Sequence, residues 1–241
     1  MTIRIILIDT THPGNIGATA RAMKNMGLFD LMLVNPRYFP HDDAIARASG
    51  AEDVLEATRV VDNLDEALNN CIYVAGASAR ARTIKWPSMA PRECARKLLQ
   101  ESHNGPVAVV FGSEKSGLTN ADIDRCNTLI KIPTNPSFSS LNLAMAVQVI
   151  SYELLVAKIG MTKENYLSEV SLATCEELEH FYVHLQDVLI DGGFLDPDNP
   201  RHLMRRLRRL FARAQPDQNE INILRGMLSA LDPKTRKGVE K

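Results

Sequence analysis

Short, continuous apolar runs alternate with helical patterns along the first two thirds of the chain. The runs that predict strands are Ile3–Ile8, Leu31–Val34, Ile72–Ala75, Val107–Phe111 and Leu129–Ile132, with a weaker one at Arg59–Val61. Because they do not alternate between apolar and polar residues, they are typical of strands covered on both faces, as in a parallel sheet. The helical patterns cover residues 16–26, 43–49, 63–69, 91–101, 120–125 and 141–158. This rhythm predicts an α/β domain with a mostly parallel sheet over residues 1–159.

The pattern changes near Gly160. Residues 160–173 are polar and lack a clear period, which predicts a linker. Thr174 and Glu177 then have the spacing of a capping box, in which each side chain bonds the backbone N–H of the other residue. Three helical patterns follow, at 174–190, 200–214 and 217–231. Residues 174–241 are therefore expected to form a small all-helical C-terminal extension.

Composition places few limits on function. Hydrophobic residues make up 45% of the 241 positions and the formal net charge is −1, which is ordinary for a globular protein. No uninterrupted apolar run approaches the roughly 18 residues of a membrane span, so we expect no membrane segment. The four cysteines are widely spaced and form no Cys-x-x-Cys pair, so they indicate neither a metal site nor a disulfide framework. These features predict a protein of the reducing cytoplasm.

A glycine-containing stretch, GSEKSGLT at 112–119, directly follows the predicted strand Val107–Phe111. A phosphate-binding loop of the Walker type needs a lysine after its second glycine, and this chain has Leu118 there. Glu114 would also repel a polyphosphate. No Gly-x-Gly-x-x-Gly pattern follows a strand, which argues against a Rossmann loop. The plain alternative is a tight turn whose glycines supply a positive φ.

Two further stretches rich in Gly, Asn, Ser or Pro also follow predicted strands and precede helices. They cover residues 10–28 and 132–154. Ligands bind open α/β sheets at the carboxyl ends of their strands. The three stretches together therefore predict one binding site at that edge of the sheet.

The three stretches carry ordered motifs that resemble those of the SPOUT superfamily of S-adenosylmethionine-dependent RNA methyltransferases, in its TrmH-like branch. These motifs are Asn15-x-Gly17-x-x-Ala20-Arg21, Phe111-Gly112-x-Glu114-x-x-Gly117-Leu118, and Ile132-Pro133 with Ser140-Leu141-Asn142. The resemblance implies an α/β fold with a deep C-terminal trefoil knot, in which the end of the domain threads through an earlier loop. It also implies S-adenosylmethionine bound in that knot, and a homodimer with its active site near the dimer interface.

The segment Ser78-Ala79-Arg80 and the arginine-rich tail extend the likeness to members of this branch that methylate tRNA. The resemblance then implies a ribose 2′-O-methyltransferase for the pyrimidine nucleotide at position 32 of the anticodon loop, with tRNA bound by the helical extension. Two alternatives stay open. One is a methyltransferase for ribosomal RNA or another tRNA nucleotide, and the other is a non-catalytic RNA-binding protein on the same fold.

The resemblance also assigns site residues. Arg21 ends the first motif, and because a guanidinium is essentially never deprotonated in proteins, we expect it to orient the RNA phosphate and the ribose hydroxyl. The alternatives for Arg21 are a solvated helix arginine and a dimer salt bridge. Methyl transfer requires no metal, and we expect none. The catalytic candidates are Arg21, Ser140 and Asn142. The cofactor-binding candidates are Ala77, Ser78, Ala79, Gly112, Glu114, Gly117, Ile132, Ser139, Ser140 and Leu141.

Several candidates also have a purely structural interpretation. Ser140 would suit the N-cap of the helix at 141–158, and Asn15 would suit a cap of the first helix. Asn142 could fix the loop that precedes its helix. Glu114 could hold its loop through backbone N–H groups or pair with a basic residue of a partner chain.

The segment 200–214 carries six arginines and no acid. Its apolar stripe is predicted to contain Leu203, Met204, Leu207, Leu210 and Phe211. The arginines must occupy the other faces, where we expect a sequence-independent contact with the tRNA backbone. The alternative is a charged surface paired with acids such as Glu176, Glu177 and Glu179. The RNA-binding candidates are Asn15, Arg21, Arg80, Arg82, Arg205, Arg208 and Arg209, with Lys85 and Trp86 beside Arg82.

Overall fold

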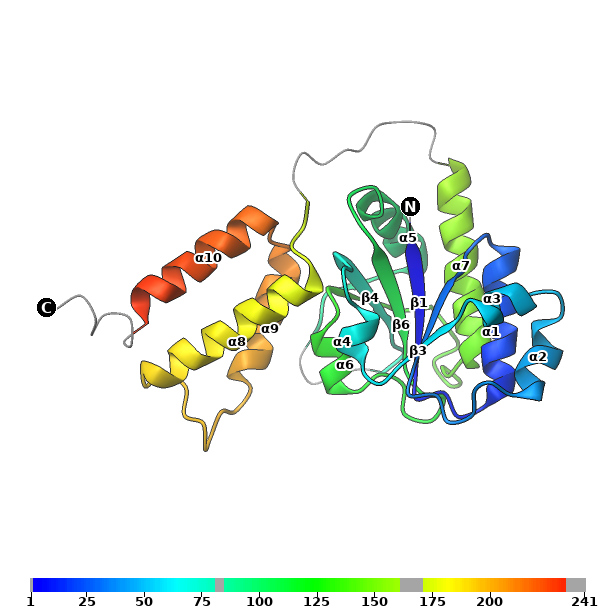
Figure 1. The fold of residues 1–241 in the computed structure, drawn as a ribbon, viewed down its shortest axis with the longest axis horizontal. Helices are drawn as coiled ribbons and strands as arrows, with labels where there is room; N and C mark the ends of the chain where they lie inside the picture. Colours follow the sequence, from blue (N-terminus) through cyan, green and yellow to red (C-terminus); the bar gives the residue numbers. More distant parts are fainter. Residues whose placement is uncertain (1, 81–84, 161–170, 233–241) are drawn as a thin grey trace, which may run out of the picture.

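A computed structural model of the protein describes residues 2–80, 85–160 and 171–232. Within them, seven strands form one sheet in the order β3-β2-β1-β6-β4-β7-β5 (Figure 1). All of its pairings are parallel, which confirms the predicted α/β class. The strands are β1 Ile3–Ile8, β2 Asp30–Val34, β3 Arg59–Val61, β4 Tyr73–Ala77, β5 Ser88–Met89, β6 Val107–Phe111 and β7 Thr128–Ile130.

Helices cover both faces of the sheet. They are α1 Pro13–Asn25, α2 Asp42–Ala48, α3 Glu52–Glu56, α4 Leu64–Ala67, α5 Pro91–Glu101, α6 Asn120–Asp124 and α7 Leu143–Gly160. The first helix begins three residues earlier than predicted, because Pro13 is well tolerated in a first turn, where its missing N–H has no helical partner. The sequence pattern predicts neither α3 nor β5, because elements this short show no period of their own.

Side chains of the central strands alternate between two apolar layers. Ile5 and Leu7 of β1 belong to the layer formed with α1, α2, α5 and α7. Ile6 and Ile8 belong to the opposite layer, which includes Ala67 of α4 and residues of α6. This burial on both faces explains why the strands read as unbroken apolar runs.

The most apolar helix of the sheet domain is α7. By length and composition alone it could cross a membrane, with a mean hydropathy of 1.5 over 18 residues. The expectation that no such stretch exists considered only uninterrupted runs, and Gln148, Ser151 and Glu153 interrupt this one. In the structure one face of α7, with Val147 and Ile150, is buried in the layer shared with α1 and α5.

Three helices follow residue 171 in the described part of the chain: α8 Cys175–Asp191, α9 Leu203–Ala214 and α10 Gln218–Leu231. They share a small core in which the rings of Phe181 and Phe211 meet edge to face at 4.8 Å. The predicted capping box is confirmed, because the Thr174 N–H donates to Glu177 at 2.8 Å and the Glu177 N–H donates to the Thr174 hydroxyl at 3.2 Å. Most of the predicted linker, 161–170, lies outside the described residues.

The helical unit α8–α10 packs on the side of the sheet domain that carries α4 and α6 (Figure 1). Ala212 of α9 is buried in the same apolar layer as Ile6 and Ile8. The backbone N–H of Cys175 donates to the carbonyl of Cys71 at 2.9 Å. The short helices α4 and α6 cover this face only in part, and α9 completes the cover.

Candidate active site

A cavity of about 590 Å³ lies at the carboxyl edge of the sheet, within the size range of small-molecule sites. The segments that follow β4, β6 and β7 line it. Two of the three predicted stretches, 112–119 and 132–154, therefore line one hollow, whereas the stretch 10–28 lines neighbouring hollows instead. Every cofactor candidate is among its lining residues: Ala77, Ser78, Ala79, Gly112, Glu114, Gly117, Ile132, Ser139, Ser140 and Leu141.

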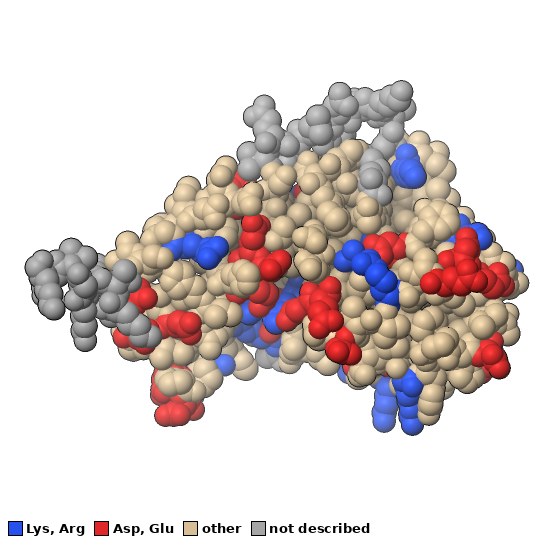
Figure 2. Space-filling model, viewed as in Figure 1, with Lys and Arg blue, Asp and Glu red and all other residues tan. Residues whose placement is uncertain are grey.

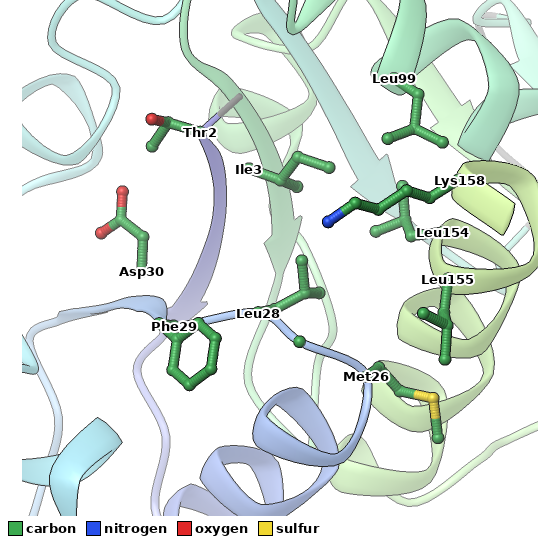
Figure 3. Close-up of a pocket in the computed structure, with 11 residues that line it drawn as sticks. Thr2, Ile3, Met26, Leu28, Phe29, Asp30, Leu99, Leu154, Leu155 and Lys158 are labelled. Atoms are coloured by element: carbon green, nitrogen blue, oxygen red, sulfur yellow. The ribbon is translucent and has the colours of Figure 1, made fainter. Parts of the chain in front are cut away.

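A smaller hollow of about 220 Å³ lies at the opposite edge of the sheet (Figure 3). Its walls include Ile3 and Asp30, near the starts of β1 and β2, and Leu154 and Lys158 near the end of α7. In Figure 3 the Lys158 side chain extends across it toward the first residues of β1. None of the described site candidates lines this hollow. We therefore take the larger cavity as the candidate cofactor site.

The two glycines of the 112–119 loop are required by the backbone of the loop itself. A Cβ at Gly112 would lie 2.1 Å from the carbonyl carbon of Gly117, and Gly117 has a φ of +64°. The Gly117 N–H donates to the Ser113 carbonyl at 2.8 Å and closes the turn. The tight turn is therefore confirmed, but only Gly117 supplies a positive φ, whereas Gly112 is needed because there is no room for a Cβ. The same tight turn brings backbone groups to the wall of the cavity.

Glu114 ties this loop to the segment that follows β1. One carboxylate oxygen accepts from the N–H and the hydroxyl of Thr11, at 3.0 and 2.9 Å. The other accepts from the N–H of His12 at 3.2 Å and from the side-chain amide of Asn15 at 2.9 Å. Burial on its own would raise the pKa of this carboxyl, but the donors outweigh burial and lower it. Glu114 therefore holds two loops together as an ionised carboxylate, partly through backbone N–H groups as predicted.

Asn142 extends this connection to the start of α7. Its side-chain amide donates to the Asn15 side-chain carbonyl at 3.0 Å, and its own side-chain oxygen accepts the N–H groups of Ala144 and Met145 at 3.0 and 3.4 Å. Those last two bonds are what an N-cap residue makes. The expectation that Ser140 caps this helix is wrong, because α7 begins at Leu143.

Asn15 does not cap the first helix either. That helix begins at Pro13, and its N-cap residue, His12, makes no side-chain cap bond. Asn15 instead bridges Glu114 and Asn142. The polar residues Asn15, Glu114 and Asn142 of the three motifs thus form one hydrogen-bonded chain across three loops.

Arg21 lies on α1 in a separate groove of about 650 Å³. Asn142 and Met145 line this groove, whereas Leu141 and Leu143 line the cavity, so the chain at 141–145 separates the two hollows. Arg21 is exposed and makes no hydrogen bond or ion pair within the described part of the chain. The structure thus brings Arg21 and Asn142 together, and it places Ser140 on the cavity side.

Two RNA-binding candidates in α9 are engaged inside the protein. The Nε of Arg205 lies 2.9 Å from Asp124 of α6. Arg208 pairs with both carboxylate oxygens of Glu179, and its guanidinium lies 4.3 Å from the centre of the Tyr182 ring. This is the alternative in which acids of the protein pair the arginines. RNA contact by Arg205 and Arg208 stays a prediction, and these geometries favour a structural role.

The remaining basic candidates differ in their surroundings. Arg80 lines the cavity, and its guanidinium donates to the Lys115 carbonyl at 3.2 Å. Arg82 lies outside the described residues. The Nε of Arg209 is buried without a hydrogen-bond partner in the described part of the chain. Leu210, predicted for the apolar stripe of α9, is 46% exposed, because the buried face of the helix is set by Phe211 and Ala212.

Sequence reasoning missed some residues of the site. Thr11 supplies two of the bonds to Glu114, and Lys115 and Thr134 line the cavity. All three lie within stretches that were singled out. Nothing in their residue types distinguishes them from ordinary loop residues.

Two family profiles match consecutive parts of the chain. The profile of the SpoU rRNA Methylase family matches residues 2–152. The profile of the C-terminal domain of the tRNA methyltransferase TrmJ matches residues 176–240. The matches therefore extend over both the sheet domain and the helical unit.

Curated relatives match along nearly the whole chain. The tRNA (cytidine/uridine/adenosine-2′-O-)-methyltransferase TrmJ of Pseudomonas aeruginosa (strain UCBPP-PA14) is 53% identical, and the match covers 94% of this chain and 92% of the relative. The tRNA (cytidine/uridine-2′-O-)-methyltransferase TrmJ of Photorhabdus laumondii is 48% identical, with 98% of both chains covered.

Solved structures of methyltransferases also resemble this chain. The crystal structure of TrmJ from Z. mobilis ZM4 is 37% identical with a TM-score of 0.84, and the match covers 96% of this chain and 99% of that one. The SpoU methyltransferase AviRb from Streptomyces viridochromogenes, solved in complex with the cofactor AdoMet, has a TM-score of 0.55 at 23% identity over 66% of this chain and 62% of that one. The second likeness concerns the fold alone.

Proposed function

The chain belongs to the SpoU methylase family and is an S-adenosylmethionine-dependent tRNA 2′-O-methyltransferase, and we propose that its acceptor is the pyrimidine nucleotide at position 32 of the anticodon loop. The names of both relatives include cytidine and uridine, and that of the Pseudomonas aeruginosa relative also includes adenosine. The match of the helical unit to a tRNA methyltransferase domain supports tRNA as the substrate. In the structure, the cavity that collects all the cofactor candidates supports the methyl-donor site of this enzyme.

The cavity suits the adenosine end of S-adenosylmethionine. That end is uncharged, so backbone groups and apolar walls can hold it. Ile130, Ile132 and Leu141 supply apolar side chains, and the tight turn at Gly112 brings backbone groups to the wall. When bound, the cofactor supplies an electrophilic methyl group on a sulfonium, and the task of the protein is to position the acceptor.

We propose that Arg21 and Asn142 position the RNA for this reaction. With S-adenosylmethionine bound, its methyl group would pass to the ribose 2′-oxygen, the sulfonium would leave as a neutral thioether, and the hydroxyl proton would go to solvent water. An arginine that holds the neighbouring phosphate and faces the hydroxyl stabilises the negative charge that develops on that oxygen. Arg21 is available for this role because it is exposed and has no partner within the described residues.

We propose a homodimer that packs through α7. Met145, Tyr152 and Ile159 are spaced by seven residues, so they lie on one face of the helix. Their side chains are 63%, 53% and 74% exposed. A helix that is apolar on all sides is normally buried on all sides, and a second copy would cover this face. The Arg21 groove also includes Met145, so the dimer would form next to the site.

The trefoil knot is proposed as well. The chain after β7 returns to the loops that follow β4 and β6, because Ile132 and Ser139 share the cavity with Ser78 and Gly112. It then enters α7, which packs against α1 and α5. This return of the chain to the earlier loops supports the proposed threading. Free cysteines and a tRNA substrate support a place in the cytoplasm.

Ribosomal RNA is the second candidate substrate, because the family profile carries that name. The experiment compares transfer of labelled methyl from S-adenosylmethionine to unmodified tRNA and to unmodified ribosomal RNA. We expect label on tRNA, in a nucleotide that resists alkaline cleavage because its 2′-oxygen is blocked. Label on ribosomal RNA alone would assign the other substrate, and the absence of label on either RNA would remove the enzymatic function.

A further inference from the structure

An open groove of about 750 Å³ lies beside the cofactor cavity. It shares Glu114 and Lys115 with the cavity, so the two hollows have a common wall. The segment from Arg37 to His41, which links β2 to α2, forms its other side. We propose that this groove binds an unpaired tRNA nucleotide next to the methylated one, with its base stacked on Tyr38 and its phosphate near Arg37 and Lys115. The inference rests on the proposed tRNA substrate.

Tyr38 has the properties of a stacking residue. Its side chain is 48% exposed although the ring is large and apolar. The guanidinium of Arg37 lies 5.2 Å from the centre of the ring, and the ring of His41 lies 6.3 Å away at an angle of 55°. Unpaired bases in RNA loops stack on aromatic rings and on guanidinium planes. The groove presents both.

The segment that carries Tyr38 is fixed to the sheet. The Arg37 N–H donates to the carbonyl of Thr10 at 3.0 Å. Two residues before Arg37, the side-chain amide of Asn35 donates to the Asp9 carboxylate at 2.8 Å. After Tyr38, Phe39 packs against the main core. A stacking residue held in this way loses little conformational freedom when a base arrives.

Two cationic side chains, Arg37 and Lys115, line the groove together with two carboxylates, Asp43 and Glu114. Neither the Arg37 guanidinium nor the Lys115 ammonium has a carboxylate partner within the described residues, whereas Arg59 and Arg125 are both paired. The carboxylate of Glu114 already accepts four hydrogen bonds from the protein, and the Asp43 carboxylate lies 4.0 Å from His41, so Arg37 and Lys115 are the groups left to meet a phosphate. Lys and Arg side chains project from the lower edge of the molecule in Figure 2, the edge at which β1 ends.

The location of the groove beside the cofactor cavity determines which nucleotide it can bind. The acceptor ribose must reach the cavity, and the groove begins at the cavity wall formed by Glu114 and Lys115. A nucleotide in the groove is therefore a neighbour of the acceptor along the strand. Duplex RNA cannot present a splayed base to Tyr38, so the groove selects a single-stranded loop.

The test is a double-mutant cycle that combines substitutions in the protein with removal of single bases from the RNA. Tyr38→Ala, Tyr38→Phe and Arg37→Ala are compared with wild type on intact tRNA and on tRNAs that lack the base just before or just after the acceptor. Phe29→Ala is the matched control, because Phe29 is 56% exposed and lines the hollow at the opposite edge of the sheet. Calorimetry of S-adenosylmethionine binding and the unfolding temperature verify that each variant is folded.

We expect Tyr38→Ala to raise the KM for intact tRNA about 5- to 100-fold, the range for loss of one stacked base. Tyr38→Phe keeps the ring and should stay within about twofold of wild type. On the tRNA that lacks the stacked base, Tyr38→Ala should have no further effect. An equal penalty on all three RNAs, or none on intact tRNA, would overturn the groove proposal. If wild type itself methylates no tRNA, the proposed function fails instead.

Discussion

The side-chain amide of Asn142 donates a hydrogen bond of 3.0 Å to Asn15, a residue 127 positions earlier in the chain. Asn15 in turn donates to Glu114, which also accepts from Thr11 and His12. Three loops that follow three strands are therefore held in one network. The cofactor cavity is lined by the loops that follow β6 and β7, and Asn15 and Asn142 of the network line the Arg21 groove. We expect both hollows to keep their shape only while this hydrogen-bond network is intact.

Replacement of Glu114 by alanine should loosen these loops. It leaves the N–H groups of Thr11 and His12 without their acceptor, at a cost of about 1–3 kcal/mol in the free energy of unfolding. Affinity for S-adenosylmethionine should fall as well, because the loop lines the cavity. Denaturant unfolding and calorimetry measure the two effects. Glu56→Ala, which removes an exposed carboxylate, is the control, and equal results for both variants would show that the network is unimportant.

The contribution of Glu114 should also depend on pH. Its pKa is lowered in the folded protein from an ordinary value of 4.5, so the folded state favours the ionised form. The stabilisation is complete above pH 4.5 and is lost as the pH falls through the lower pKa of the folded state. The difference in unfolding free energy between wild type and Glu114→Gln should therefore be constant from pH 7 to about 5.5 and shrink below about 4.5. A difference that grew on acidification would contradict this sign.

Arg21→Ala should separate chemistry from cofactor binding. Arg21 lies outside the cavity, so calorimetry should give wild-type affinity for S-adenosylmethionine. The rate of methyl transfer at saturating cofactor should fall by about 10²–10³-fold, which is typical for loss of one group that stabilises developing charge. Lost cofactor affinity together with a small rate defect would assign Arg21 a structural role.

Arg205 and Asp124 should be coupled in stability. Their side chains are only 15% and 18% exposed, and burial raises the pKa of Asp124 in spite of the nearby arginine. Arg205→Ala leaves a half-buried carboxylate without its partner, whereas the double variant with Asp124→Ala does not. We expect a coupling energy of about 0.5–3 kcal/mol from a double-mutant cycle. The salt dependence of tRNA binding gives an independent check. If tRNA affinity falls less steeply with salt concentration in Arg205→Ala than in wild type, Arg205 contacts the RNA backbone after all.

Tyr152→Glu should break the proposed dimer. The substitution places a charge in the centre of the exposed apolar face of α7, where a second copy would bury it without a partner. Sedimentation should show a shift from dimer to monomer at micromolar concentration. Phe194→Glu alters a residue that is 73% exposed on the helical unit and should leave the mass unchanged. A wild-type protein that sediments as a monomer would refute the dimer directly.

Much of the fold could be predicted because local patterns and tertiary structure agree. The strands Ile3–Ile8 and Val107–Phe111 and the helix Pro91–Glu101 have the predicted bounds, since burial on both faces and a first-turn proline leave clear signals. The weaker strand Arg59–Val61 also has the predicted bounds, although it is largely exposed. The start of α7 was misplaced because Ser140 and Asn142 are both good caps. Only the tertiary bond to Asn15 shows which of them is in position.

The site was less predictable than the fold. The motifs identified which residues surround the cavity, yet the division between cavity and Arg21 groove depends on how the chain at 141–145 runs in space. The arginines of α9 illustrate the same limit. Their density in the sequence favours RNA, and only the folded structure reveals that Asp124 and Glu179 face Arg205 and Arg208. Tyr38 carried no motif, and its exposure became visible only in three dimensions.

The most direct test of the central claim is to map the methylated nucleotide. Unmodified tRNA is incubated with the protein and labelled S-adenosylmethionine, and the product is cleaved by alkali and sequenced. The account predicts one uncleaved bond, on the 3′ side of nucleotide 32, that carries the label and disappears with Arg21→Ala. Label on a base, or a resistant bond at another nucleotide, would contradict it.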